Sequence, residues 1–278
     1  MKCTRIIFRC SILLPCLIFM SSLQVLAQSN ISRVGSMPVV LLDNYFNHEV
    51  HKKTGKIYHY TWEDTENSGF SGWGKIFCRE GFDTLTLSVA PTKKNLKAAA
   101  VYIIVDPDDS RESANPHLID QASIKTIEHW VKSGGILLMM ANDSGNCEFT
   151  NFNLLASAFG FQFNEVRRNV PGAGNVNMEK ASFRSFPDHP FFRDVKAVFI
   201  KEICTLSLDD RSDAIFSEGG DDLIAVIPHG KGKVVVIPDP WFYNEYLNGE
   251  PKCRLTDEYQ NATVAGNIAR WLRLQSTR

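Results

Sequence analysis

Apolar runs alternate with helical patterns along most of the chain. Four runs are apolar at consecutive positions, which is typical of strands buried on both faces of a parallel sheet between helices. These runs are 39–42, 101–105, 136–141 and 234–237. A further run, 224–227, is joined to the last one by the turn-forming segment Pro228–Lys233. This pair predicts an antiparallel hairpin at one side of the sheet.

Helical spacing fills the stretches between these runs. In 120–132, Ile124, Ile127 and Val131 recur on one face, and Ser133 followed by two glycines marks the end of the helix. The same reasoning predicts helices at 71–79, 152–159 and 263–274. The alternation of strands and helices predicts a single three-layer α/β domain over residues 37–276, with a mostly parallel sheet.

Polar residues follow the four strand-like runs, and ligands of open α/β sheets gather beyond the carboxyl ends of strands. Tyr45 and Trp241, close to two of these ends, could offer aromatic faces to a sugar ring. The candidate ligand-binding residues are Asp43, Tyr45, Asn142, Asp143, Asp239 and Trp241. Carboxylates and amides at strand ends also commonly cap turns and helix starts, so a capping role stays open for the polar residues. Trp241 could equally pack against the last helix.

Catalytic residues are less clear from the sequence. Asp43 and Asp239 form the best candidate acid–base pair, because they follow separate strands and could face each other. Asp106 and Asp108, by contrast, are expected in a solvated turn, since their segment lacks the ligand spacing of a calcium loop.

The N-terminus has the features of an export signal. Three cations precede an apolar stretch, and Val25-Leu26-Ala27 is typical of a cleavage site before Gln28. Residues 1–27 are therefore expected to be a signal peptide, and 28–36 a short lead. The mature protein is expected to be secreted or periplasmic, with no membrane association after signal cleavage, because no later segment is long and apolar enough to span a bilayer.

Composition excludes some functions. The 278 residues carry a net charge of −1, which excludes a broadly basic nucleic-acid binder. Serine-hydrolase, P-loop, EF-hand and zinc motifs are absent, so we expect no metal and no cofactor. The cysteines outside the signal peptide are widely spaced, which favours mostly buried free thiols with at most one disulfide. They are Cys78, Cys147, Cys204 and Cys253.

Several segments, in this order, resemble a known family. They are Val39–Asn47, Tyr58–Asp64, Asn67–Ser71, Tyr102–Asp108, Ala141–Asn146, His189–Phe192, Ile200–Glu202 and Asp239–Tyr246. Together they resemble the glutamine-amidotransferase-like module of secreted Bacteroidetes polysaccharide-degradation proteins, which is often fused to unsaturated rhamnogalacturonyl hydrolases. The resemblance implies a flavodoxin-like, class I amidotransferase-type sheet and a pectin or related glycan context.

The resemblance does not extend to glutamine hydrolysis. The family's nucleophilic cysteine lies on a turn that corresponds here to Met140–Gly145, where no cysteine occurs, and Cys147 lies beyond it. A later His-x-Glu pair is also absent, so the thiolate chemistry has no support. The helical barrel that carries the hydrolase activity of fused relatives is not part of this sequence.

These observations favour an exported, non-catalytic module that assists pectin or rhamnogalacturonan breakdown by binding an oligosaccharide or a glycan-degrading enzyme. Two alternatives stay open. One is a hydrolase acting on unsaturated rhamnogalacturonan-type oligosaccharides, and the other is a protein-interaction module.

Overall fold

The computed structural model describes residues 37–210, 212–247 and 258–276. The expected signal peptide, the lead segment and Cys253 lie outside these ranges. Residues Pro38–Arg278 form one compact unit.

A nine-stranded mixed sheet organises this unit. Its first five strands run parallel in the order β2-β1-β3-β4-β11. They are β1 (Val39–Asp43), β2 (Asp83–Leu87), β3 (Ala99–Val105), β4 (Ile136–Met140) and β11 (Gly232–Ile237). All four strands that the apolar runs predict are present.

Antiparallel strands extend the sheet beyond β11. They are β10 (Asp221–His229), β8 (Ile203–Leu208), β5 (Phe161–Arg168) and β9 (Ala214–Glu218), and a separate small sheet pairs β6 (Ser182–Phe183) with β7 (Val198–Phe199). The predicted hairpin is confirmed as β10–β11. It was expected at one side of the sheet, but β11 lies in the interior between β4 and β10, so the hairpin joins the parallel and antiparallel parts.

Five α-helices cover the sheet: α2 (Ser71–Arg79), α3 (Lys93–Leu96), α4 (Gln121–Lys132), α5 (Phe149–Ser157) and α6 (Asn261–Gln275). The α2 bounds are those predicted. Helix α5 begins three residues before the prediction, because the Glu148 carboxylate accepts from the Asn151 backbone N–H and starts the helix there.

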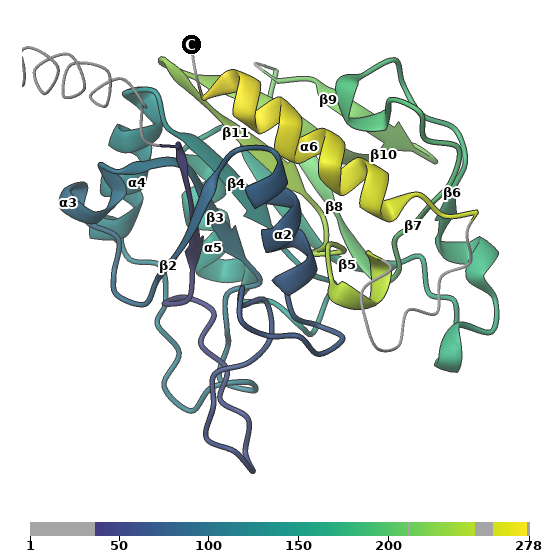
Figure 1. Cartoon of the computed structure of the whole chain (residues 1–278), viewed down its shortest axis with the longest axis horizontal. Helices are drawn as coiled ribbons and strands as arrows, with labels where there is room; N and C mark the ends of the chain where they lie inside the picture. Colours follow the sequence, from purple (N-terminus) through teal and green to yellow (C-terminus); the bar gives the residue numbers. More distant parts are fainter. Residues whose placement is uncertain (1–36, 211, 248–257, 277–278) are drawn as a thin grey trace, which may run out of the picture. The chain divides into compact units, whose positions relative to one another are not determined.

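Two hydrophobic cores lie on opposite faces of the sheet, which gives three layers (Figure 1). Alternate residues of each strand point to opposite faces. In β1, Val40 and Leu42 join the core beneath α2 and α6, whereas Leu41 joins the core beneath α4 and α5. The mixed three-layer α/β fold predicted from the sequence is therefore confirmed.

Three cysteines lie in the described part of the chain, and none of them forms a disulfide there. Cys147 and Cys204 are buried and Cys78 is exposed. Within the described ranges, every helix is too short or too polar to cross a bilayer.

Candidate functional site

A pocket of about 230 Å³ lies beyond the carboxyl ends of β4 and β11, where the polar strand ends were expected to meet. We refer to it as the strand-end pocket. Asn142 and Asp143 follow β4, and Asp239 follows β11. Loop residues complete the wall: His59, Tyr60, Asn67, Ser68, Asn146, Lys201, Glu202, Tyr243, Glu245 and Tyr246.

Asp106, which follows β3, supports this pocket from behind. Its Oδ2 accepts hydrogen bonds from the Tyr60 hydroxyl at 2.6 Å and from the Asn142 amide at 2.9 Å, and both of these donors line the pocket. Its Oδ1 is buried and has no hydrogen-bond partner in the described structure. Burial raises the pKa of Asp106 well above its ordinary value, although the bond from Tyr60 opposes this shift.

Asp143 is fully buried and ion-paired. Its Oδ1 accepts from the Asn146 amide at 2.6 Å, and Oδ2 lies 2.9 Å from Nε of Arg167. Arg167 also pairs with Glu202, so it holds two of the pocket's carboxylates together. Burial raises the pKa of Asp143, while the Asn146 bond and the Arg167 charge work in the opposite direction.

Asp239 differs from both of these residues. Its side chain is 4% exposed and lines the pocket, yet no described residue donates a hydrogen bond to its carboxyl group. Burial, followed by the nearby charges of Asp106 and Asp143, raises its pKa well above the ordinary value. A buried carboxyl group without a partner is costly to keep in a fold, and this makes Asp239 the strongest indication of a ligand.

The backbone around the pocket is strained. Seven non-glycine residues in the described ranges have a positive φ. Three of them, His59, Tyr60 and Glu202, line the pocket, and a fourth, Asp106, lies directly behind it. Such conformations cost about 1–3 kcal/mol each and gather at functional sites, where the surrounding structure maintains them.

Asp43 does not reach this pocket. Its carboxylate accepts from the backbone N–H groups of Tyr45 and Phe46 and, at 2.5 Å, from the Tyr102 hydroxyl. The Tyr102 ring belongs to the core beneath α4 and α5, whereas Tyr60 belongs to the opposite core. The capping interpretation is therefore correct for Asp43, and the structure does not bring Asp43 and Asp239 together as an acid–base pair.

The two aromatic candidates also lie outside the pocket. Trp241 has no exposed surface and packs against Phe242, so the core-packing alternative holds and its ring is not a platform for a sugar. Tyr45 is half-buried and stacks on His117, with ring centroids 4.0 Å apart. Of the six candidates, Asn142, Asp143 and Asp239 line the strand-end pocket, and Asp43, Tyr45 and Trp241 do not.

The sequence reasoning missed several residues of the site. Asp106 and Asp108 were expected in solvated turns, but they are 3% and 2% exposed, because loops and neighbouring strand ends cover them. The position of Asp106 at a strand end was a usable signal. Tyr60 and Glu202 come from loops with positive φ, for which the local sequence carries no signal.

Cys147 is not placed as a nucleophile. Its side chain is 3% exposed, and burial raises its pKa well above the ordinary value, which favours the unreactive thiol. In the described ranges, no group of three or more histidine, cysteine, aspartate or glutamate side chains is arranged to hold a metal ion.

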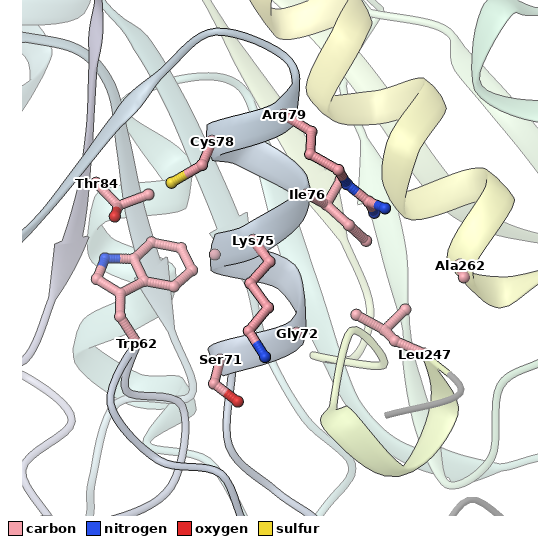
Figure 2. A pocket seen from close by; sticks show the side chains of 11 residues that line it. Trp62, Ser71, Gly72, Lys75, Ile76, Cys78, Arg79, Thr84, Leu247 and Ala262 are labelled. Atoms are coloured by element: carbon pink, nitrogen blue, oxygen red, sulfur yellow. The ribbon is translucent and has the colours of Figure 1, made fainter. Parts of the chain in front are cut away.

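A second pocket, of about 690 Å³, lies along α2 (Figure 2). Trp62 and Thr84 form one side of it, and Leu247 and Ala262 form the other. The ionisable side chains on its wall, Lys75, Cys78 and Arg79, are all exposed. This pocket is larger, but it lacks the buried polar groups that make the strand-end pocket a candidate site.

Comparisons with known proteins address the fold. No family model matches the chain, and no curated protein matches it in sequence. Among solved structures, the chain is similar to the mmIFT52 N-terminal domain, with 19% identity and a TM-score of 0.62 over 84% of this chain and 96% of that domain. It is also similar to the cytoplasmic protein STM1381 from Salmonella typhimurium LT2, with 15% identity and a TM-score of 0.56 over 86% of this chain and 99% of that protein. At these identities the chain shares a mixed α/β fold with both proteins, and the likeness extends to the fold alone.

Proposed function

We propose that this protein is an exported, non-catalytic α/β module that binds a sugar unit in the strand-end pocket and assists glycan breakdown. The proposal includes a flavodoxin-like, class I amidotransferase-type fold without glutaminase activity. The sequence resemblance suggests pectin or rhamnogalacturonan as the glycan. The single observation that carries the binding site is the carboxyl group of Asp239, a residue that is 4% exposed, lines the pocket and accepts no side-chain hydrogen bond from any described residue.

The chemistry of the wall suits hydroxyl groups. Carboxylates accept hydrogen bonds from sugar hydroxyls, and the amides of Asn142 and Asn146 and the hydroxyls of the tyrosines can both donate and accept. A cavity of about 230 Å³ lies below the range of about 300–1,000 Å³ typical of drug-sized ligands. It therefore suits one sugar ring or the end of a chain rather than a long oligosaccharide.

A hydrolytic role has less support. The acid–base pair that the sequence suggested would have required Asp43 and Asp239 to flank one bond, but Asp43 is bonded to Tyr102 on the other face of the sheet. Glycoside hydrolysis usually needs two carboxyl groups placed across the scissile bond. Binding without catalysis accounts for the pocket with fewer requirements.

Calorimetry with pectic and rhamnogalacturonan oligosaccharides tests the proposal. We expect saturable binding that Asn142→Ala and Asn146→Ala each weaken by about tenfold, the scale of one or two lost hydrogen bonds. Tyr45→Ala is the control, because Tyr45 follows β1, which β3 separates from β4, and its side chain does not line the pocket. An absence of binding across the panel would overturn the proposal, and so would binding that only Tyr45→Ala removes.

A further inference from the structure

The strand-end pocket carries an excess of negative charge. Its lining residues include four carboxyl groups, from Asp143, Glu202, Asp239 and Glu245, and one lysine, Lys201. The lysine lies 3.4 Å from Glu202, and its charge also acts on Asp239, whose pKa it lowers against the stronger effect of burial. Together with His59, these are the ionisable residues on the wall apart from the tyrosines.

Two further charges lie immediately behind this wall. Arg167 pairs with Asp143 and Glu202, which accounts for the remaining cation. Asp106, behind Tyr60 and Asn142, adds another buried carboxyl group with an unpartnered oxygen. Within the described residues, the carboxyl groups of Asp239, Glu245 and Asp106 form no ion pair, so the pocket keeps an excess of negative charge.

Aromatic side chains lie beside these unmatched acids. Tyr60 and Tyr243 stack with ring centroids 5.7 Å apart, and Tyr243 and Tyr246 lie 5.5 Å apart. All three tyrosines line the pocket. Aromatic rings attract cations as well as sugar faces, because the ring quadrupole places negative charge on the face.

We propose that the strand-end pocket selects a sugar that bears a free, positively charged amino group. This inference rests on the proposed sugar-binding function, but it replaces the pectic glycan that the resemblance suggests, because pectin and rhamnogalacturonan are built from uronates and neutral sugars and carry no amino group. In the bound state the ammonium group donates to the Asp239 carboxylate, and the ring hydroxyls bond to the amides and tyrosines of the wall. Charge complementarity of this kind also acts against a uronate, whose carboxylate would meet buried like charges.

Binding of such a ligand changes the protonation of the Asp239 carboxyl group. The carboxyl group of Asp239 holds a proton more tightly than an ordinary aspartate, because of its burial and its acidic neighbours. An ammonium group favours the ionised carboxylate, so at a pH where the Asp239 carboxyl group is protonated, its proton leaves for the solvent when the amino sugar binds. A neutral sugar gives no such release.

The test compares three sugars of one stereochemistry that differ in charge: galactosamine, galactose and galacturonate. We expect galactosamine to bind about tenfold or more tightly than galactose, the scale of one charge-assisted hydrogen bond, and galacturonate to bind most weakly. Calorimetry in two buffers of different ionisation enthalpy should show proton release with galactosamine only. Asp239→Asn should remove both the preference and the release, while Asp43→Asn, which changes a buried carboxyl group outside the pocket, should leave both unchanged.

The outcomes separate the two proposals. Equal affinity for the three sugars, a preference for galacturonate, or a preference that survives Asp239→Asn would overturn the charge selection and leave sugar binding in place. If no sugar of this set and no oligosaccharide of the pectic panel binds, the proposed function itself fails. A thermal melt of each variant, compared with the unsubstituted protein, confirms that loss of binding is not loss of folding.

Discussion

The Tyr60 hydroxyl donates a 2.6 Å hydrogen bond to the Asp106 carboxylate, across 46 positions of sequence. Tyr60 lies in a loop with a φ of 41°, and Asp106, which directly follows β3, has a φ of 43°. Both backbone conformations are uncommon for residues other than glycine. The bond therefore ties two strained segments together behind the strand-end pocket, and it satisfies one oxygen of a carboxyl group whose other oxygen has no partner.

Removing this donor should destabilise the protein. Tyr60→Phe leaves the Asp106 Oδ2 with the Asn142 amide alone, so we expect a loss of about 1–3 kcal/mol in the free energy of unfolding, measured by urea denaturation. Tyr58→Phe is the matched control, because its hydroxyl donates to Glu49 at 3.1 Å from a half-buried position. The control should change stability by less than about 0.5 kcal/mol, and equal losses in the two variants would contradict the argument.

The same bond shows how far the sequence could predict the site. The unbroken apolar runs predicted strands of a parallel sheet, and the carboxyl ends of parallel strands meet at one edge, so Asn142, Asp143 and Asp239 were expected there together with Asp43. Side chains alternate between the two faces along β1, and this turns Asp43 towards the Tyr102 side of the sheet. The sequence does not show which face each loop covers, so it could not separate Asp43 from the pocket. Tyr60 reaches the site through backbone with positive φ, which local sequence does not specify.

The fold, like the site, could be predicted from the sequence only in part. Four of the five parallel strands, β1, β3, β4 and β11, were predicted because both of their faces are buried, which makes nearly every position apolar. Strand β2, with the sequence DTLTL, was not predicted because it is an edge strand with mostly exposed side chains. The location of the β10–β11 hairpin inside the sheet depends on contacts with β4 and β8, which lie far away in sequence.

Stability should fall as the pH rises through the acidic range. Burial raises the pKa values of Asp43 and Asp108 to about 6, and that of Glu112 to about 7. Between their ordinary values, near 4, and these raised values, the folded state binds more protons than the unfolded state, so the free energy of unfolding decreases with increasing pH. We expect higher stability at pH 5 than at pH 8 in urea denaturation. A constant or increasing stability over this interval would show that these carboxyl groups are ionised in the fold without cost.

The variant Asp239→Asn tests how much one such buried carboxyl group contributes to the pH dependence of stability. Burial raises the pKa of this carboxyl group as well, so the group lowers the free energy of unfolding increasingly as the pH rises above the ordinary pKa of aspartate. The neutral amide should therefore raise the melting temperature at pH 8, with about 2–4 °C expected per kcal/mol gained in a domain of this size, and the gain should shrink towards pH 4. Asp83→Asn, at an exposed position, should show no gain that depends on pH.

Asn244 should be among the most sensitive polar positions. It is 1% exposed, its amide donates to the carbonyl groups of Asp64 and Glu66, and its Oδ1 accepts from the Gly72 N–H at 2.7 Å. Helix α2 has no side-chain cap of its own, so Asn244 supplies the acceptor that the first turn requires.

Asn244→Ala removes three hydrogen bonds at once and leaves the Gly72 N–H without its side-chain acceptor, and we expect a loss of about 2–4 kcal/mol in chemical denaturation. The matched control is Asn151→Ala in the half-buried first turn of α5, where water can replace the amide bond to Glu148. A loss below about 1 kcal/mol for Asn244→Ala would mean that the loop and α2 hold each other by other contacts.

Two helical glycines should respond to alanine in opposite directions. Alanine is favoured over glycine in a helix interior by about 0.5–1 kcal/mol. At Gly266 in α6 an added Cβ meets no atom within 4 Å, so Gly266→Ala should gain stability of this size. At Gly74 in α2 the added Cβ would lie 3.1 Å from the Trp62 ring, which is fixed by its own bond to the Leu85 carbonyl group. Gly74→Ala should therefore lose about 1–3 kcal/mol through overpacking, and equal gains at the two positions would show that Trp62 moves freely away from α2.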